Sequence, residues 1–349
     1  MRFIHTADIH IGASPSRRLF KTRDTYLKRL NECEDAFFRV LEHAVTEHYE
    51  AILVAGDWFD HPRVARSTLK RLEDAITQAN LPVVVILGNH DAFAHEARFA
   101  VLDHPLVHVL TKDNPTLTLG DVTFIGQATH AFDLDQLHTH LENTSSTYKV
   151  VLLHGDVQNN KDEHYLTSLT KLKKLSADYV ALGHIHQHAF VAPNIAYSGN
   201  LEPHDPSETG EKGFISVDLA KKAFTFVPFS LREVRHETMH FQDEDHAQMA
   251  SAWLQHVVEA DRQRHLYRLI LTGTKGLEET SLERLEARLD DAFYAYELRD
   301  ERRPNIDHAA LLKNYQNTII ATLLEADDGD DDEALALALE ALLETEETR

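Results

Sequence analysis

The sequence predicts an α/β layered fold, and three observations support this prediction. Short runs rich in β-branched residues alternate with helix-period stretches over the first two hundred residues. Several of the apolar runs are continuous, as in PVVVIL at 82–87, which is typical of strands buried on both faces. At 349 residues, with 43% hydrophobic residues, the chain is long enough for about two to three domains with substantial cores.

The first part of the chain supplies most of the expected strands. They are 2–7, 51–55, 82–87, 107–110, 122–126, 149–153, 178–182 and 195–198. Between them, the clearest amphipathic helices are 24–48, 67–80 and 164–175. The segments GFISVDL and AFTFVPF, which begin at residue 213, predict a hairpin that closes this first domain.

A second, smaller domain is expected after the hairpin. A helix at 243–261 precedes a compact β-α-β unit, which consists of a strand at 265–273, a helix at 278–292 and a strand at 293–300. Residues 307–325 are expected to be helical, and the acidic turn at 327–333 would cap a last helix, ALALALEALLE. We therefore expect domains at 1–235 and 236–305, followed by a helical and acidic tail at 306–349.

The charge of the chain restricts its partners. It has 35 Lys and Arg residues against 57 Asp and Glu residues, a formal net charge of −22. Such acidity argues against a general polyanion binder, which would present a basic face. It does not exclude a nucleic-acid enzyme, because bound metal ions supply local positive charge. Part of the negative charge is concentrated in the last segment of the sequence, since residues 325–349 contain eleven acidic residues and one arginine.

The single cysteine and the N-terminus predict a cytoplasmic protein. Cys33 excludes an intrachain disulfide, and its helix-period neighbours predict that it is a small buried apolar residue. The N-terminal segment MRFIHTADIH has no signal-peptide core, and no apolar run is long enough to cross a bilayer. We therefore expect no membrane association.

Polar side chains follow five of the expected strands directly, each at the strand's carboxyl end. They are Asp8 and His10, then Asp57, then Asn89, His90 and Asp91, then His154, and finally His184 and His186. Ligand sites in open α/β sheets gather at the carboxyl ends of the strands, so these side chains are expected to converge. Each motif alone is more often a turn or a hydrogen-bonded histidine, but their fixed order at successive strand ends favours one shared site.

The chemistry of this set predicts a pair of metal ions. It contains carboxylates, imidazoles and an amide oxygen, a mixture that suits Mn²⁺, Fe²⁺ or Zn²⁺ better than Ca²⁺ or Mg²⁺ alone. Seven potential ligands among these side chains are too many for one ion, but they suffice for two ions when one carboxylate bridges the ions. Two ions about 3.5–4 Å apart activate water and stabilise the oxygens of a phosphoester displacement.

The motifs DIH, GDWFD, GNHD, HGD and GHIH, in this order, resemble those of the calcineurin-like metallophosphoesterase superfamily. Within it, HTADIHIG at the start and YSGNLEP followed by EKGF are similar to the SbcD/YhaO-type DNA repair nucleases, although Ser198 and Asn200 replace the usual Pro and Ser. FYAYELRDERRP resembles the accessory domain of the YhaO-like members, so the resemblance covers roughly residues 1–305. It implies a layered α/β/β/α sandwich with a small α+β accessory domain that caps it.

The resemblance also implies roles for individual residues. One ion would be bound by Asp8, His10, Asp57 and His186, and the second by Asp57, Asn89, His154 and His184, with Asp57 as the bridging carboxylate. His90 matches the catalytic histidine beside the scissile phosphate, and Asp91 would either orient it or cap the turn. The most suitable ions would be two Mn²⁺, with Fe²⁺, Zn²⁺ or Mg²⁺ as alternatives.

The expected function is a metal-dependent DNA nuclease, exonuclease or endonuclease, that acts in repair or end processing. The resemblance implies an SMC-like coiled-coil ATPase as a partner, which the C-terminal tail would bind unless that tail is disordered, and a homodimer. Two basic stretches, 17–29 and 63–71, are expected either to contact DNA phosphates or to be solvated helix faces. Their candidate DNA-binding residues are Arg17, Arg18, Arg63 and Arg66.

Two other functions remain open from the sequence. The same metal site would serve a phosphatase or a cyclic-nucleotide phosphodiesterase with a small substrate. A non-catalytic scaffold that only binds a partner ATPase is the alternative of another class. The presence of every ligand position and of His90 argues against the scaffold.

Overall fold

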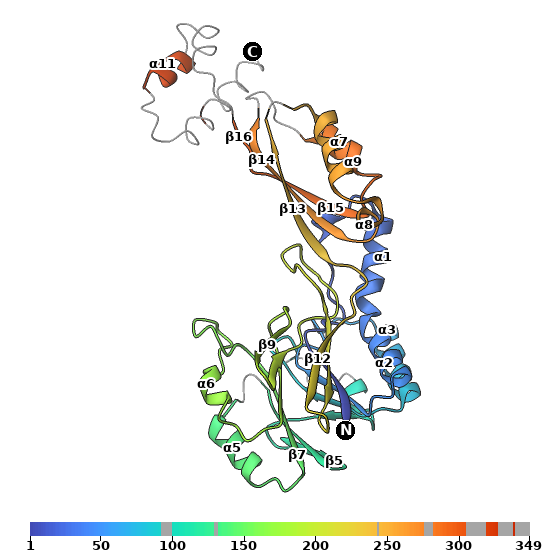
Figure 1. The fold of residues 1–349 in the computed structure, drawn as a ribbon. Helices are drawn as coiled ribbons and strands as arrows, with labels where there is room; N and C mark the ends of the chain where they lie inside the picture. The colour runs from blue at the N-terminus through green and yellow to red at the C-terminus, as the bar shows by residue number, and fades with distance from the viewer. Residues whose placement is uncertain are drawn as a thin grey trace. The chain divides into compact units, whose positions relative to one another are not determined.

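The structure is a computed structural model that describes residues 1–91, 100–128, 132–242, 244–275, 282–304, 319–326 and 338. It divides into two compact units, which we treat separately (Figure 1). Unit 1 comprises Met1–Arg17 and Tyr26–Val234, and unit 2 comprises Arg18–Thr25 and Arg235–Arg349. Apart from Ala338, the predicted acidic turn and last helix lie outside the described residues.

One six-stranded sheet of unit 1 contains the first four strands of the chain. Its order is β12-β11-β1-β2-β3-β4. Strands β1 to β4 are parallel, whereas β11 is antiparallel to β1 and to β12, so the predicted hairpin is confirmed. The bounds are Arg2–Thr6 (β1), Ala51–Ala55 (β2), Val83–Ile86 (β3), Val107–Val109 (β4), Gly213–Asp218 (β11) and Ala223–Pro228 (β12).

The second six-stranded sheet has the order β5-β6-β7-β8-β10-β9. Strands β6, β7, β8 and β10 are parallel, and β5 and β9 are antiparallel edge strands that the sequence patterns did not indicate. The bounds are Thr116–Leu119 (β5), Val122–Gln127 (β6), Tyr148–His154 (β7), Tyr179–Gly183 (β8), Ala189–Ala192 (β9) and Ile195–Tyr197 (β10).

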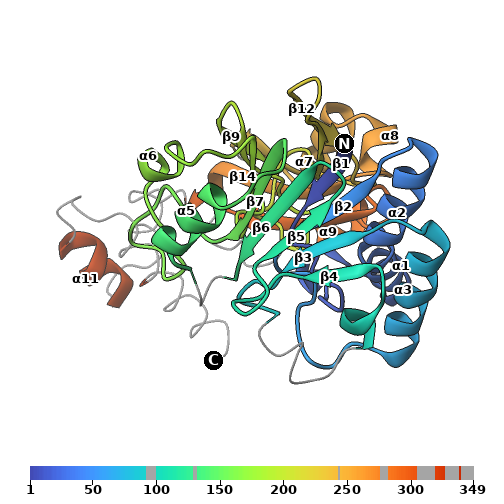
Figure 2. The ribbon, with the colours of Figure 1, turned by 90° about the horizontal axis from the view of Figure 1, so that it is seen from below.

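Helices cover the outer face of each sheet (Figure 2). Figure 2 shows α2 and α3 on one side of the paired sheets and α5 and α6 on the other. Their bounds, with those of α1 and the two short 3₁₀ helices, are Arg17–Leu19 (η1), Arg23–Glu34 (α1), Ala36–Thr46 (α2), Arg66–Ala79 (α3), Ala100–Asp103 (η2), Leu134–Glu142 (α5) and Leu169–Leu172 (α6).

Three apolar clusters hold these layers together. Phe37 of α2 and Ile76 of α3 pack on the first sheet, and Leu137 of α5 packs on the second. Between the sheets lies the third cluster, in which side chains such as Leu53 and Val150 are fully buried. An α/β/β/α sandwich is therefore observed, and the predicted fold class is confirmed.

Unit 2 is a four-stranded sheet with helices packed on it. Strands β13, β14 and β15 are neighbours in that order, β14 and β15 are parallel, and β16 extends the pairing of β14. Trp253, Tyr267 and Leu285 lie at the centre of its core. The bounds are Val234–Phe241 (β13), His246–His256 (α7), Glu259–Arg262 (α8), Leu266–Lys275 (β14), Glu283–Leu289 (α9), Ala295–Asp300 (β15), Arg303–Pro304 (β16) and Ile319–Ala326 (α11).

Three predicted helices were wrong in extent. The helix expected at 243–261 is divided into α7 and α8 by Val257 and Val258, which have extended backbone conformations. The single helix expected at 24–48 is divided at Asp35, whose carboxylate accepts a hydrogen bond from Arg71 of α3 at 2.7 Å. The helix expected at 164–175 is reduced to the four residues of α6. Residues 164–166 instead exchange backbone hydrogen bonds with Asp156, because tertiary pairing there overrides the helical pattern.

Within the described residues, no helix combines the length and the apolar character that crossing a membrane would require.

A buried histidine predicts acid sensitivity of unit 1. His5 of β1 lies fully buried between the sheets, where its Nδ1 is 2.8 Å from the Tyr179 hydroxyl. Burial disfavours the imidazolium and lowers the pKa of His5 to about 3, whereas an unfolded histidine titrates near 6.5. The unfolded chain therefore takes up the proton first, and this part of the stability is lost as pH falls from 6.5 towards 3.

We expect the free energy of unfolding of the parent protein, relative to that of His5→Gln, to fall by about 1.4 kcal/mol per pH unit between pH 6 and 4. Urea unfolding followed by circular dichroism, in buffer with EDTA, measures this difference, and the other histidines cancel in the comparison. Parallel stability curves for the two proteins would contradict the assignment.

Candidate metal centre

The carboxyl ends of strands from both sheets meet at one place in unit 1. Asp8 and His10 follow β1, Asp57 follows β2, and His154 is the last residue of β7. Three overlapping clusters in this region each place ligand atoms within 4.8 Å of one another. The clusters are Asp8, His10 and His186; Asp8, Asp57 and His154; and His10, Asp60 and His90.

Close backbone approach makes this meeting possible. A Cβ on Gly88 would lie 2.2 Å from Oδ1 of Asp57, and a Cβ on Gly183 would lie 2.0 Å from the carbonyl oxygen of Ala55. Neither position has room for a methyl group. The glycines therefore allow the turns after β3 and β8 to contact the turn after β2.

The backbone is strained where predicted ligands stand. Asp8, His10 and Asp57 each have a φ of 51°, and His184 has a φ of 98°. Residues other than glycine rarely adopt this left-handed region, at a cost of about 1–3 kcal/mol each, and such residues gather at functional sites. Three of these residues, Asp8, His10 and Asp57, belong to the clusters described above.

Asp57 occupies the centre of the cluster. Its Oδ2 lies 3.2 Å from Nε2 of His154 and 3.9 Å from Nε2 of His10, while its Oδ1 accepts a hydrogen bond from the backbone N–H of His90 at 2.9 Å. Burial favours the neutral acid, but the hydrogen bond to His154 and the charge of that ring hold the pKa of Asp57 well below its usual range. The carboxylate thus lies between the two groups of predicted ligands, as a bridging ligand would.

Two pairs of donor atoms face common space on either side of Asp57. Nε2 of His10 and Nε2 of His186 are 3.2 Å apart. On the other side, Oδ1 of Asn89 is 3.0 Å from Nε2 of His154. Carboxylate, imidazole and amide donors that converge in this way fit transition-metal ions such as Mn²⁺, Fe²⁺ or Zn²⁺.

His184 is placed differently from the other predicted ligands. Its backbone N–H donates to the Asp8 carboxylate at 2.9 Å, and its ring lies 5.5 Å from the ring of His154. However, its Nε2 is 3.3 Å from Oδ1 of Asp162, and His184 belongs to none of the three clusters. Its role as a ligand therefore stays a prediction.

Asp60 is a site residue that the sequence analysis missed. Its Oδ1 lies 3.2 Å from Nδ1 of His10 and 3.5 Å from Nδ1 of His90. The hydrogen bond that the His90 ring donates to Asp60 outweighs the opposing effect of partial burial and raises the pKa of His90 to about 9. Asp60 is the second aspartate of the GDWFD motif, so the sequence contained a signal for this residue. Only the fold shows which rings Asp60 contacts.

Asp91 caps the turn, which was one of its two predicted roles. It is fully buried and accepts backbone N–H groups from Trp58 at 3.0 Å, Phe59 at 2.7 Å and Gly88 at 3.1 Å. These bonds connect the turn after β2 with the turn after β3. The orientation of His90 is set by Asp60 instead.

The loop after β10 contributes a second carboxylate that the sequence analysis missed. Glu208 makes a short contact through Oε1 with Nδ1 of His186. Its Oε2 accepts from Nδ2 of Asn200 at 3.1 Å and from the backbone N–H of His204 at 2.6 Å. Asn200, one of the two departures from the family motif, therefore supports the carboxylate that holds His186.

The four predicted DNA-binding arginines are exposed, and they are not all in one unit. Arg17 stacks on the Tyr26 ring at 4.6 Å, and Arg18 belongs to unit 2. Arg63 precedes α3, and Arg66 is its first residue. Arg29, the last residue of the basic stretch 17–29, is fully buried and pairs with Glu202 at 2.7 Å, so it does not face solvent.

The chain is similar to known phosphoesterases. The model of the calcineurin-like phosphoesterase family matches residues 1–188, which is more than half of the chain. YhaO, an uncharacterized metallophosphoesterase of Bacillus subtilis, is 27% identical over 237 residues. That match covers 63% of this chain and 57% of YhaO, so it spans less than two thirds of the relative.

Two solved structures show weaker similarity. The protein TT1561 of Thermus thermophilus has a TM-score of 0.43 and 14% identity, with 64% of this chain and 96% of that chain covered. A dimetal phosphatase from Danio rerio has a TM-score of 0.40 and 13% identity, with 62% of this chain and 91% of that chain covered.

Glu208 generates a prediction about metal affinity. We expect Glu208→Gln to weaken the binding of one of two Mn²⁺ ions about 10–100-fold, because carboxylates that hold ligating histidines contribute to this extent. Calorimetric titration of the metal-stripped protein with Mn²⁺ measures both sites. Asp205→Asn is the matched control, since within the described residues its Oδ1 accepts hydrogen bonds from Ser207 alone. Equal affinities in the two variants would contradict the role of Glu208.

Proposed function

Because the chain belongs to the calcineurin-like phosphoesterase family, we propose that it hydrolyses the phosphodiester bonds of DNA with the help of two divalent metal ions. The observation that carries the proposal is the convergence of Asp8, Asp57 and His154 from two sheets, with His90 beside them. The mixed donor set favours Mn²⁺ as the ion.

The donor atoms support most of the predicted assignment of ligands to the two ions. His10 and His186, which face each other, would bind one ion together with Asp8. Asn89 and His154 would bind the other, with His184 as the remaining predicted ligand. Asp57, with His154 on one side and His10 on the other, would belong to both ions. When bound, the ions would supply positive charge to the non-bridging oxygens of a phosphate and activate water.

His90 is proposed as the catalytic residue. Its side chain is 46% exposed, so it can reach a bound phosphate. Asp60 holds the ring through Nδ1, which leaves Nε2 for the substrate. The hydrogen bond to Asp60 favours the protonated ring, whose Nε2–H would stabilise the charge that develops on the phosphate or protonate the leaving oxygen.

DNA is proposed as the substrate on two grounds. The motifs HTADIHIG and EKGF are similar to those of the SbcD/YhaO-type nucleases. The exposed Arg17, Arg18, Arg63 and Arg66 would contact backbone phosphates without reading sequence. By the same resemblance, we propose a cytoplasmic homodimer that works with an SMC-like coiled-coil ATPase, through the tail at 306–349.

This function is tested by digesting end-labelled duplex and hairpin DNA in the presence of Mn²⁺. Hydrolysis of a chromogenic phosphomonoester and of cyclic AMP is measured in parallel. We expect the DNA substrates to be cleaved. Activity on the small substrates alone would favour a phosphatase or a cyclic-nucleotide phosphodiesterase. Absence of hydrolysis and of any Mn²⁺ binding would favour a scaffold.

The proposed roles of His90 and Asp57 predict different defects. We expect His90→Ala to lower the cleavage rate about 10²–10⁴-fold while the Mn²⁺ content stays near that of the parent protein, because we propose His90 as a catalytic residue and not as a ligand. Asp57→Ala should lose both cleavage and metal. Metal analysis by mass spectrometry and cleavage assays separate the two outcomes. His138→Ala on α5 is the control, and equal metal loss in His90→Ala and Asp57→Ala would refute the assigned roles.

A further inference from the structure

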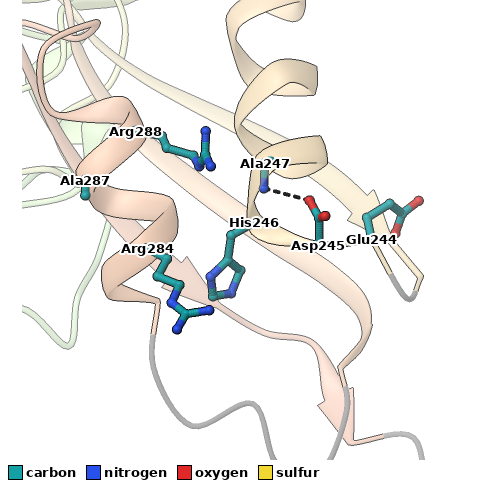
Figure 3. A pocket seen from close by; sticks show the side chains of 7 residues that line it. All are labelled: Glu244, Asp245, His246, Ala247, Arg284, Ala287 and Arg288. Atoms are coloured by element: carbon teal, nitrogen blue, oxygen red, sulfur yellow. Dashed lines mark hydrogen bonds between the residues drawn. The ribbon is translucent and has the colours of Figure 1, made fainter.

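Unit 2 contains a pocket of about 570 Å³ between the first turn of α7 and the exposed face of α9 (Figure 3). Both helices and every lining residue belong to this unit. The pocket is lined by Glu244, Asp245, His246, Ala247, Arg284, Ala287 and Arg288. None of the motifs that form the metal centre contributes to it.

Two guanidinium groups dominate the pocket. Arg284 and Arg288 lie one helical turn apart on α9, and Figure 3 shows both side chains extending towards the start of α7. Within the described part of the chain, neither side chain makes a hydrogen bond or an ion pair. In contrast, Arg235 pairs with Asp261 at 2.9 Å and Arg268 pairs with Glu297 at 2.9 Å in the same unit.

The two acidic residues of the pocket do not pair with these arginines within the described part of the chain. Asp245 is the N-cap of α7 and accepts the backbone N–H groups of Ala247 and Gln248, both at 2.8 Å. Glu244 makes a short contact with the backbone N–H of Gln242. Both carboxylates are therefore directed to backbone donors, and neither forms an ion pair with the two guanidinium groups, whose N–H donors are left for a ligand.

We propose that this pocket binds a backbone phosphate of a DNA strand. A guanidinium offers planar paired donors that match two phosphate oxygens, and side chains one turn apart lie close enough to share one phosphate or to bind two. The His246 ring, directed towards Arg284 in Figure 3, adds a third donor group on the opposite wall. The inference rests on the proposed function, because it assigns a further contact to the same DNA substrate.

A DNA strand suits the pocket better than a small anion does. The pocket is open at the surface, since both arginines are exposed, so a chain can pass across it. A net charge of −22 repels DNA from the molecule as a whole, and local cationic sites are needed to offset that repulsion. Two guanidinium groups without carboxylate partners are the arrangement that phosphate contacts require.

The test is DNA binding by the full-length protein in EDTA, which prevents cleavage. The probe is a fluorescent duplex oligonucleotide, and anisotropy is measured over a series of salt concentrations. The pocket variant is Arg284→Gln with Arg288→Gln. The matched control is Arg299→Gln with Arg303→Gln, which removes two exposed arginines of unit 2 that do not line the pocket. Circular dichroism checks that both variants are folded.

We expect the pocket variant to bind the duplex about tenfold more weakly than the control does. Its slope of log affinity against log salt should also be smaller in magnitude by about 1 if the arginines share one phosphate and by about 2 if each binds its own. Hydrolysis of a chromogenic phosphodiester should be unchanged in both variants, since this substrate is too small to need the pocket.

Three results would overturn the pocket. The first is equal DNA affinity and equal salt slope in the two variants. The second is that the parent protein binds 5′-AMP as tightly as it binds the duplex, which would show a mononucleotide site instead. The third is that it binds polyglutamate as tightly as the duplex, which would show a carboxylate site instead. A parent protein that does not bind DNA would overturn it as well. Failure of the nuclease function has a different signature, because the parent would then bind the duplex through Arg284 and Arg288 without cutting it in Mn²⁺.

Discussion

The candidate metal centre depends on the contact between two parallel-stranded sheets at the carboxyl ends of their strands. Strand β2 of one sheet lies against β7 and β8 of the other, and the glycines at 88 and 183 remove the side chains that would separate their turns. A single sheet would present only one row of ligands. Two sheets packed face to face provide donors from two directions, which is what a pair of ions needs.

Burial of charge is the second constraint on this site. Asp8, Asp57 and Asp91 are almost completely buried, and a buried carboxylate is costly unless it is hydrogen-bonded or paired. Asp91 is satisfied by three backbone N–H groups and belongs to the structure of the turns. Asp8 and Asp57 are instead surrounded by imidazoles and directed towards common space. A bound cation would compensate these two charges.

The residues around the ligands fix their geometry. Asp60 contacts the Nδ1 atoms of His10 and His90, and Glu208 contacts Nδ1 of His186. A carboxylate on one ring nitrogen orients the ring and leaves the other nitrogen for a metal or a substrate. The loop that carries Glu208 is fixed in turn by the buried pair of Arg29 and Glu202. Electrostatic support for the site therefore extends from α1 to the loop after β10.

The sequence by itself determined the fold class and the position of the ligands at strand ends, because apolar strands and the polar residues that follow them are local patterns. It indicated Asp57, His154 and His186, for example, without any knowledge of distance. It could not show that Asp60 and Glu208 contact the rings of the site histidines, since each contact joins residues whose spacing carries no periodic signal. Likewise, the pairing of 164–166 with Asp156 shortened a helix that the local pattern favoured. Only the tertiary structure decided these points, because hydrogen bonds between distant segments outweigh local preferences of a few tenths of a kcal/mol per residue.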